Sequence, residues 1–430
     1  MIQKIYPVNS LTGTLITPPD KSISHRSALF SAISSEKSIV ENYSDAADPQ
    51  STLSCLKQLG VPVIKQGSRI EIEGVGRDGF TVPSSPLDCG NSGTTMRLLG
   101  GIVAGAGIPC ELTGDHSLSA RTMKRIITPL NKMGCAIQGK DGEFAPLKIS
   151  PHNGVKGLHY PLPIASAQLK SAVLLAGLFG ENPTEVVELV PSRDHTERLL
   201  DLKTEVNGAG KIIRSSRNDV IPPQNYRIPG DFSAAAFWLV AGSIQPEARL
   251  ELPRTGMNPS RIAALEILNQ MGADITRKNE KMEGKEPVAD LVITPADLKP
   301  VNPDPSLIPN CIDELPILMV AMCFADGTSE ISGAGELRHK ETDRLAAMED
   351  MLNTAGAEIK IKEDGIIIHG RKDFIPKPAR YKSCHDHRMA MAAAVLSTRS
   401  SGVCEVTDAE CTAISYPEFW THLEQVSSKT

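Results

Sequence analysis

The sequence predicts an α/β protein of two domains, each built from three copies of one supersecondary unit. With 430 residues, the chain exceeds the size at which a single hydrophobic core usually stops growing. A pattern also recurs about every seventy residues, in which a small or polar residue opens a helix rich in Ala and Leu. The six helix starts lie near Ser22, Ser92, Ser166, Phe232, Ile312 and Asp386.

A second helix signature lies between these starts. There an amphipathic pattern ends at a glycine, which readily adopts the left-handed conformation of a helix C-cap, and a β-rich run follows. A looser copy occupies residues 199–212, and the last such helix, residues 417–426, has no strand after it. Each unit needs its neighbours to bury both of its faces. The four clearest glycines are Gly60, Gly134, Gly272 and Gly356.

The six units divide into two groups of three at the Ala- and Gly-rich stretch 240–245. The strand expected over residues 2–17 has no helix before it and could complete the C-terminal group. We therefore predict a discontinuous domain of residues 1–20 and 243–430, with residues 21–242 inserted as the other domain. Two chain crossings between lobes suit a hinged cleft, and the helix N-termini are expected to face it.

Composition excludes several classes of function. The 45 Lys and Arg against 51 Asp and Glu give a formal charge of −6, which argues against general binding of nucleic acid or anionic membranes. No run has the length of a membrane span, and the N-terminal residues lack the apolar core of a signal peptide. The 9 scattered cysteines fit free, mostly buried thiols. We expect a cytoplasmic monomer that binds neither nucleic acid nor membrane.

Residues 19–27 contain an unusual helix start. Pro18 and Pro19 block any helix before it and an apolar run follows, so the segment is a loop turning into a helix. Lys21 and Arg26 then lie in the first turns, where the partial positive charge of the helix N-terminus disfavours cations. An anionic ligand held by N–H groups, hydroxyls and both cations would offset the repulsion. The alternative is a solvated, slightly unfavourable helix start.

Polar residues of the same kind lie at the other helix starts. Converging N-termini and Arg side chains would form a site for phosphate and carboxylate groups. The glycines of residues 90–94 allow a ligand close to the backbone, but the segment is neither a P-loop nor a dinucleotide fingerprint. The candidates are the cations Lys21, Arg26, Arg97, Arg121, Arg193, Lys340, Arg344 and Arg388, with the hydroxyls of Ser22, Thr94 and Ser166.

Two carboxylates among these cations, Asp313 and Glu341, are our candidates for acid and base. Cations flank Glu341 and can hold it ionised, or a ligand can shift it; a surface capping box with salt bridges is the alternative. Residues 385–387 suggest metal ligands, but without a third ligand we expect helix capping. Residues 193–197 fit a capped helix start as readily as a triad fragment, and no nucleophile elbow supports a serine hydrolase.

Six segments stand out by their order and spacing: Asp20-Lys21-Ser22-Ile23-Ser24-His25-Arg26, Gly90-Asn91-Ser92-Gly93-Thr94-Thr95-Met96-Arg97, Ser166-Ala167-Gln168, Asp313-Glu314, Lys340-Glu341-Thr342-Asp343-Arg344-Leu345 and Asp386-His387-Arg388. Together they resemble the EPSP synthase (3-phosphoshikimate 1-carboxyvinyltransferase) family along essentially the whole chain. The resemblance implies two similar domains of three βαβαββ units each, an inside-out α/β barrel with helix N-termini facing the interdomain cleft. It also implies transfer of the enolpyruvyl group of phosphoenolpyruvate to the 5-hydroxyl of shikimate 3-phosphate, in the shikimate pathway to chorismate, without cofactor or metal.

The same resemblance assigns roles to individual residues. Asp313 would be the base on the 5-hydroxyl and Glu341 the proton relay to the methylene carbon, with Lys21 assisting. Phosphoenolpyruvate would be held by Lys21, Gly93, Thr94, Arg121, Gln168, Arg344 and Arg388. Shikimate 3-phosphate would be held by Lys21, Ser22, Arg26, Ser166, Ala167, Gln168, Arg193, Asp313 and Lys340.

Several positions depart from the wider family. Ala167, where many members have a second Ser, and residues 193–197 look like the subgroup often called class II, known for tolerating the inhibitor glyphosate. Ile414 occupies the place of a phosphoenolpyruvate-binding Lys of many class I members, and Glu336 replaces a substrate-contacting Asn. Gly93 leaves space beside the phosphoenolpyruvate site, so we expect glyphosate to enter.

Two other functions remain open at this point. The first is enolpyruvyl transfer to UDP-N-acetylglucosamine, but that enzyme typically carries a Cys in the mobile loop matching residues 114–121, which have none. The second is a noncatalytic anion-binding repeat protein, which would not need the acid–base pair of Asp313 and Glu341.

Overall fold

The computed structural model describes residues 1–208 and 210–429, which form two compact units. Unit 1 comprises Met1–Asp20 and the chain from Pro229 onward, and unit 2 comprises Lys21–Ile228. The chain thus returns to unit 1 at Pro229, so the boundary predicted at residue 243 lies too far along the sequence. The Ala- and Gly-rich stretch taken as the seam is the end of a helix, Phe232–Ile244, that is buried along its whole length in unit 1.

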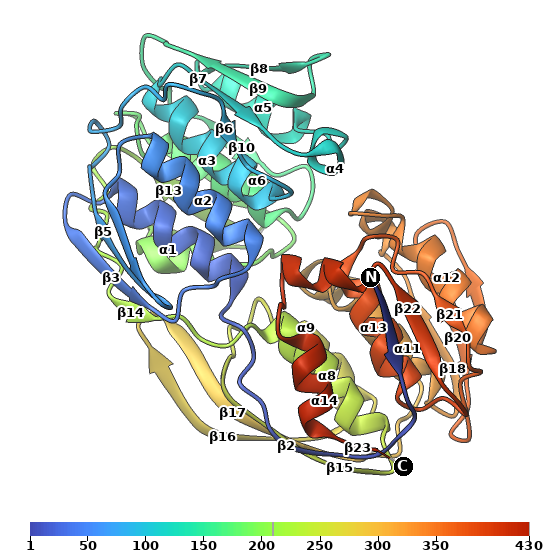
Figure 1. Ribbon diagram of the computed structural model, residues 1–430. Helices are drawn as coiled ribbons and strands as arrows, with labels where there is room; N and C mark the ends of the chain where they lie inside the picture. Colours follow the sequence, from blue (N-terminus) through green and yellow to red (C-terminus); the bar gives the residue numbers. More distant parts are fainter. Residues whose placement is uncertain (209, 430) are drawn as a thin grey trace. The chain divides into compact units, whose positions relative to one another are not determined.

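Three helices form the buried centre of unit 2 (Figure 1). Small and apolar side chains surround most of their circumference, so each helix must be covered on all sides. Shorter helices lie outside them, and the most amphipathic of these turns its apolar residues Ile126 and Leu130 inward. The central helices are α1 (Lys21–Ile33), α3 (Gly93–Ala106) and α6 (Ala167–Gly177); the outer ones are α2 (Ala47–Gln58), α4 (His116–Ser119), α5 (Lys124–Lys132) and α7 (His195–Leu200).

Three four-stranded sheets cover the helices of unit 2. In each sheet the first two strands are parallel and the rest antiparallel. Strand β9 alternates buried and exposed side chains, as expected of a strand with one face on the core. The strand orders are β14 (Tyr226–Arg227)-β3 (Lys37–Glu41)-β5 (Arg69–Glu73)-β4 (Val63–Gln66); β6 (Leu87–Asp88)-β7 (Cys110–Thr113)-β9 (Phe144–Ser150)-β8 (Ala136–Lys140); and β10 (His159–Pro161)-β11 (Thr184–Glu188)-β13 (Gly210–Ser215)-β12 (Thr204–Asn207).

Unit 1 repeats this plan around three other buried helices (Figure 1). An aromatic group of Trp238, Tyr416 and Phe419 packs between a central and an outer helix. The central helices are α8 (Phe232–Ile244), α11 (Leu315–Cys323) and α13 (His387–Ser397); the others are α9 (Ala263–Gln270), α10 (Ile308–Cys311), α12 (Arg344–Ala355) and α14 (Phe419–Val426), with short 3-10 helices η1 (Pro305–Leu307), η2 (Gly335–His339) and η3 (Ala409–Ile414).

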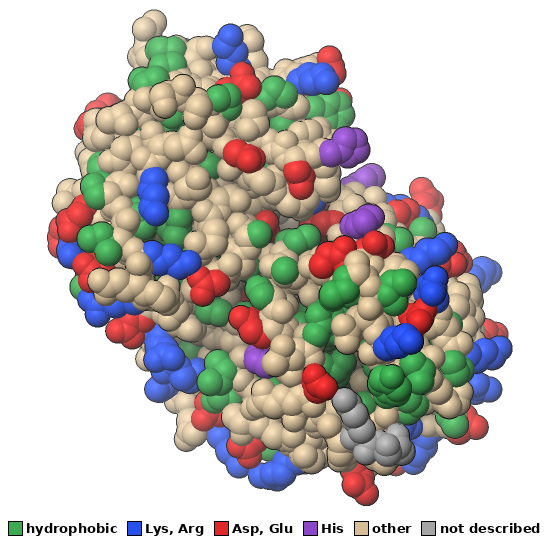
Figure 2. Space-filling model, viewed as in Figure 1, with side chains coloured by type: hydrophobic (Ala, Val, Ile, Leu, Met, Phe, Trp, Pro, Cys, Tyr) green, Lys and Arg blue, Asp and Glu red, His purple; other side chains and the backbone are tan. Residues whose placement is uncertain are grey.

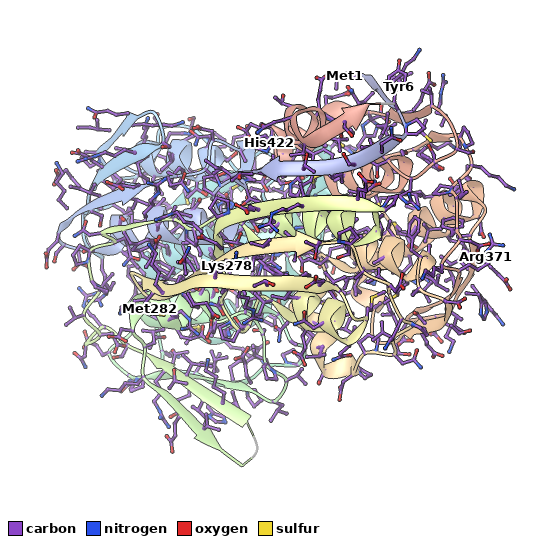
Figure 3. All side chains as sticks on the ribbon, turned by 90° about the horizontal axis from the view of Figure 1, so that it is seen from below. Met1, Tyr6, Lys278, Met282, Arg371 and His422 are labelled. Carbon is purple, nitrogen blue, oxygen red and sulfur yellow. The ribbon has the colours of Figure 1, made fainter. Side chains whose placement is uncertain are left out.

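The sheets of unit 1 include one broad five-stranded sheet. In Figure 3 its ribbons run side by side, and the labelled Lys278 and Met282 lie on its edge strand β16. The exposed, charged side chains of β16 discourage pairing of this edge with another chain. The strand orders are β16 (Asp274–Glu283)-β17 (Glu286–Thr294)-β15 (Glu247–Gly256)-β2 (Val8–Thr14)-β23 (Ser427–Lys429); β18 (Gly327–Ile331)-β20 (Ile366–Gly370)-β19 (Glu358–Ile361); and β1 (Ile2–Ile5)-β22 (Cys404–Thr407)-β21 (Arg380–Tyr381).

Two strands pair within one unit, although the central helix that follows each of them belongs to the other unit. Strand β2 precedes α1 but pairs with β15 in unit 1, and β14 precedes α8 but pairs with β3 in unit 2. The N-terminal chain does complete the C-terminal group, although as two strands, β1 and β2, and not as one. The expectation that no strand follows the last helix is wrong, because β23 pairs with β2.

The sixfold repeat predicted from the sequence is present. Five of the predicted starts lie within one residue of the first residue of a central helix, and the sixth, Ile312, lies three residues before α11. The four predicted C-cap glycines have φ of +84°, +89°, +82° and +88°, the left-handed region that favours glycine. All nine cysteines are free thiols, and only Cys110 and Cys384 are not buried.

Side chains of both signs are interspersed on the face shown in Figure 2. Within the described part of the chain, no single helix is long and apolar enough to cross a membrane. The bent pair Pro305–Cys311 and Leu315–Cys323 passes that test only when both helices are counted together, and the second of them is buried in the core of unit 1.

Candidate active site

The start of α1 brings two cations to one end of unit 2. The Nζ of Lys21 lies 2.9 Å from Oδ2 of Asp48, and Lys21 and Ser22 remain partly exposed. Arg26 is 3% exposed and donates to the hydroxyls of Thr196 at 2.8 Å and Ser171 at 3.0 Å. Arg26 therefore also joins α1 to α6 and α7.

The start of α3 lies against the start of α6. Ser92 caps α3 by accepting from the N–H of Thr95 at 3.0 Å. Gln168 of α6 donates to the hydroxyl of Thr94 at 3.0 Å and accepts from Arg97 at 2.6 Å. The amide of Gln168 thus fixes a hydroxyl and a guanidinium in one orientation, at the N-terminal end of both helices.

Gly93 begins α3 where two guanidinium groups approach its backbone. A Cβ placed there would lie 2.8 Å from one terminal nitrogen of Arg97 and 3.6 Å from one of Arg121. Arg121 donates to Oδ1 of Asn91 at 2.9 Å and to the hydroxyl of Ser117 at 3.2 Å. Backbone N–H groups and cations therefore surround the point where Gly93 has no side chain.

Three further predicted residues of unit 2 lie at or before helix starts. Ser166 caps α6, accepting from the N–H of Leu169 at 3.4 Å, and Ala167 is its first residue. Arg193 lies half-buried before α7, in which His195 and Glu197 are buried. Residues 193–197 therefore form a helix start, as one of the two readings of the sequence proposed.

Arg344 is the centre of the cluster in unit 1. It is 1% exposed and donates to Asp386 at 2.7 Å, Glu341 at 2.5 Å and Asp313 at 3.3 Å. Burial alone lowers the pKa of Arg344, but Asp386, Glu341 and Asp313 outweigh it and raise that pKa above its usual value. Lys340 lies 3.4 Å from the same oxygen of Asp313, so two cations hold the Asp313 carboxylate.

Arg388 lies beside Asp313 through backbone and side-chain contacts. Its guanidinium donates to the carbonyl of Asp313 at 2.9 Å and to the hydroxyl of Ser233 at 2.6 Å. Asp386 caps α13 by accepting from the N–H of Arg388 at 2.8 Å. This contact confirms the capping role expected for residues 385–387, and within the described residues no group of three or more metal-ligating side chains comes together.

The structure therefore gathers the predicted residues in two clusters, one at the helix N-termini of each unit. Glu336 and Ile414 lie at η2 and η3, and Ile414 packs against the core. The cluster of unit 2 contains Lys21, Ser22, Arg26, Gly93, Thr94, Arg97, Arg121, Ser166, Ala167, Gln168 and Arg193, and that of unit 1 contains Asp313, Lys340, Glu341, Arg344 and Arg388.

Sequence reasoning missed several buried polar residues beneath these clusters. His25 contacts the hydroxyl of Thr52 at 2.7 Å. Burial, and then Lys21 and Arg26, lower the pKa of His25 well below its usual value. Glu314 is fully buried and binds Arg261 through both oxygens at 3.0 Å. Both His25 and Glu314 stand in the segments that carry the family resemblance, but the sequence does not mark their side chains as buried.

Three comparisons give the same family. A model of the family described as EPSP synthase (3-phosphoshikimate 1-carboxyvinyltransferase) matches residues 5–423. Proteins named 3-phosphoshikimate 1-carboxyvinyltransferase are 47% identical in Salinibacter ruber, over 99% of this chain and 100% of the relative, and 44% identical in Syntrophomonas wolfei, over 97% and 98%. The solved EPSP synthase of Acinetobacter baumannii is similar with a TM-score of 0.88 and 38% identity, over 100% of this chain and 98% of that one.

A more distant structure shares the fold. The enolpyruvyl transferase NikO of Streptomyces tendae is similar with a TM-score of 0.78 over 99% of this chain and 97% of that one, at 15% identity. At that identity the likeness concerns the arrangement of helices and sheets alone.

Proposed function

This chain belongs to the EPSP synthase family, and we propose that its two clusters have different roles, one chiefly in binding and the other chiefly in proton transfer. The reaction of the family is transfer of the enolpyruvyl group of phosphoenolpyruvate to the 5-hydroxyl of shikimate 3-phosphate. The reaction releases phosphate and belongs to the shikimate pathway towards chorismate and the aromatic amino acids. The contact of Arg344 with Asp313 and Glu341 carries the proposal, because it places two carboxylates at one cation.

Phosphoenolpyruvate offers a phosphate and a carboxylate, which suit guanidinium groups and helix N-termini. As the family resemblance implies, we assign its binding to Lys21, Gly93, Thr94, Arg121, Gln168, Arg344 and Arg388. We assign shikimate 3-phosphate to Lys21, Ser22, Arg26, Ser166, Ala167, Gln168, Arg193, Asp313 and Lys340. Arg26, which is mostly buried, would contribute chiefly by orienting Ser22, whose carbonyl it binds at 3.1 Å.

Asp313 acts as the base in this proposal. Its contacts with Lys340 and Arg344 favour the ionised form, which can take the proton of the 5-hydroxyl as its oxygen attacks C2. The product of that step is a tetrahedral adduct, and loss of a proton from its methyl group with departure of phosphate gives the enol ether.

Glu341 delivers the proton to the methylene carbon and later removes one. Its contact with Arg344 favours the ionised form, which is the form required for the second of these steps. A substrate carboxylate bound to Arg344 would compete for the guanidinium and so favour the protonated form of Glu341, which the first step requires. Lys21, held by Asp48 at 2.9 Å, assists this transfer.

The substrate test is release of phosphate from phosphoenolpyruvate with each acceptor. We expect release with shikimate 3-phosphate, the acceptor in the names of the relatives, and none with UDP-N-acetylglucosamine. Glu341→Ala and Lys21→Ala should abolish release, whereas Lys372→Ala, on an exposed ion pair of unit 1, should not. Release with UDP-N-acetylglucosamine alone would overturn the proposal.

We also propose a cytoplasmic monomer that needs neither cofactor nor metal and binds neither nucleic acid nor membrane. The mixed surface charge and the formal charge of −6 support the last two points. Light scattering should give the mass of one chain, and activity should persist after treatment with a chelator. A dimer mass, or activity lost to the chelator and restored by a metal, would contradict these points.

A further inference from the structure

Lys170 is a cation in the interior of unit 2. It lies on α6, two residues after Gln168, and its side chain is 0% exposed. Its Nζ lies 2.9 Å from Oε1 of Glu188, 2.8 Å from Oε1 of Glu197 and 3.5 Å from the carbonyl of Ser192. An ammonium has three N–H donors, and burying it is costly unless they are paired. The three acceptors meet that need.

These acceptors surround the segment that connects β11 to α7. Glu188 ends β11, Glu197 lies on α7, and Ser192 lies between them. Oε1 of Glu188 also accepts from the N–H of Ser192 at 3.1 Å and from its hydroxyl. Lys170 therefore holds both ends of the segment, and through Glu188 it holds the residue that precedes Arg193.

The first half of this segment has little apolar burial to fix it. Leu189 is 60% exposed and Val190 is 44% exposed, and Pro191 is also exposed. The change from exposed to buried chain occurs at Ser192, where the polar contacts begin. The position of the chain just before Arg193 is thus set by the hydrogen bonds of Ser192 to Glu188 Oε1, the oxygen that Lys170 also contacts.

We propose that Lys170 is a positioning residue that presents Arg193 to the phosphorylated acceptor, a role that rests on the proposed function of Arg193. Lys170 holds the carboxyl group of Glu188 in place, Glu188 holds Ser192, and Ser192 sets the chain entering Arg193. Phosphoenolpyruvate is assigned to other residues, so the effect is confined to the acceptor.

The test is steady-state kinetics of Lys170→Met with both substrates varied. Without its cation, Glu188 becomes a buried unpaired charge and releases Ser192. We expect the KM for shikimate 3-phosphate to rise about tenfold, with kcat and the KM for phosphoenolpyruvate within about twofold of wild type. Thermal unfolding of each variant measures how much of the protein is folded.

Two further variants separate this role from loss of structure. Lys211→Met removes the other cation on Glu197, at 2.9 Å and 27% exposed, and should leave the KM for shikimate 3-phosphate unchanged. Adding Glu188→Gln to Lys170→Met removes the unpaired charge but keeps an acceptor for Ser192, and should recover most of the affinity. If Lys170→Met does not fold, Ser192→Ala tests the same link, with an expected rise of about threefold.

Each outcome decides the proposal. A folded Lys170→Met with an unchanged KM for shikimate 3-phosphate overturns it, as does a Lys211→Met that matches Lys170→Met or a Ser192→Ala without effect. An equal rise in the KM for shikimate 3-phosphate and in the KM for phosphoenolpyruvate also overturns it, because that result indicates general damage to the protein. If the wild-type enzyme releases no phosphate with shikimate 3-phosphate, the proposed function itself is wrong. If the wild type has normal kinetics and Lys170→Met is unaffected, only the role of Lys170 is wrong.

Discussion

The two clusters share an architecture but differ in what their guanidinium groups contact. In unit 2, Arg97 donates to the amide oxygen of Gln168 and Arg121 to the amide oxygen of Asn91. In unit 1, Arg344 donates to the carboxylates of Asp386, Glu341 and Asp313. In these contacts neutral acceptors orient Arg97 and Arg121, whereas anions orient Arg344. The contrast is confined to these three groups, since Lys21 of unit 2 pairs with Asp48 and Arg388 of unit 1 donates to a hydroxyl and a carbonyl.

This difference suits two tasks. A carboxylate attracts a guanidinium by its full charge, whereas an amide oxygen carries no net charge, so a substrate anion displaces an amide oxygen more easily than a carboxylate. The carboxylates of unit 1, in turn, are proton acceptors that amide oxygens cannot replace. We infer that unit 2 chiefly binds anions and that unit 1 chiefly moves protons.

The largest expected effect tests the second half of this comparison. Asp313→Asn keeps the size of the side chain and removes the base, so kcat should fall about a thousandfold, as for loss of a general base, with both KM values within a few-fold. The matched control is Asp343→Asn, which changes a half-buried helix cap two residues from Glu341 and should leave kcat nearly unchanged. A kcat for Asp313→Asn within tenfold of wild type would remove Asp313 from the chemistry.

A second prediction concerns the stability of unit 1. Arg344→Met leaves Asp386, which is 0% exposed, as a buried charge without its cation, so the free energy of unfolding should fall by about 3–5 kcal/mol. Arg338→Met breaks a pair that is 31% and 38% exposed and should cost less than about 1 kcal/mol. Urea unfolding measures the free energy of unfolding of both variants. Equal losses would show that the buried pair of Arg344 and Asp386 stabilises the protein no more than the exposed pair of Arg338.

The contrast between the clusters was only partly predictable from the sequence. The helix starts repeat at regular spacing, so their cations and hydroxyls could be identified in order. Lys21 and Thr94 lie in the first turns of central helices, whereas Arg121 follows α4 and Lys340 follows η2. The partners could not be identified, since Arg344 with Asp386 and Lys170 with Glu197 are pairs formed by folding between distant segments. The domain boundary failed because an Ala- and Gly-rich stretch has the same composition in a linker as in a fully buried helix.

A smaller effect tests the binding role of unit 2. In Gly93→Ala the new Cβ would lie 2.8 Å from a terminal nitrogen of Arg97, so that side chain must shift and the space beside Gly93 is filled. We expect the KM for phosphoenolpyruvate to rise about tenfold, and competitive inhibition by glyphosate, which we expect in the wild type, to weaken by more.

The control for this variant lies on the same helix. In Gly100→Ala the Cβ would meet only Ile126 and Leu112, each at 3.5 Å, which is ordinary contact. Its KM for phosphoenolpyruvate should stay at the wild-type value, and its stability should not fall, since Ala favours helix over Gly. If glyphosate inhibits Gly93→Ala as strongly as it inhibits the wild type, the inhibitor does not approach this position.

The smallest expected effect concerns His25, which links three helices of unit 2, α1, α2 and α3. Its Nδ1 contacts Thr52 at 2.7 Å, and Thr52 contacts the hydroxyl of Thr95 at 2.8 Å. That hydroxyl donates to Ser92, the cap of α3, at 2.8 Å. The order of the α3 start thus depends on a histidine that burial, together with Lys21 and Arg26, keeps neutral.

The sign of the pH effect follows from the lowered pKa of His25. Below a pH of about 6.5 the unfolded chain binds a proton at this histidine and the folded chain does not, so stability falls with pH by up to about 1.4 kcal/mol per unit. His25→Asn keeps a polar atom near Nδ1 but does not titrate, so its unfolding free energy should fall less than that of wild type between about pH 7 and pH 5. Parallel curves in urea unfolding would show that His25 is protonated in the folded protein, and the neutral link between α1 and α3 would then be wrong.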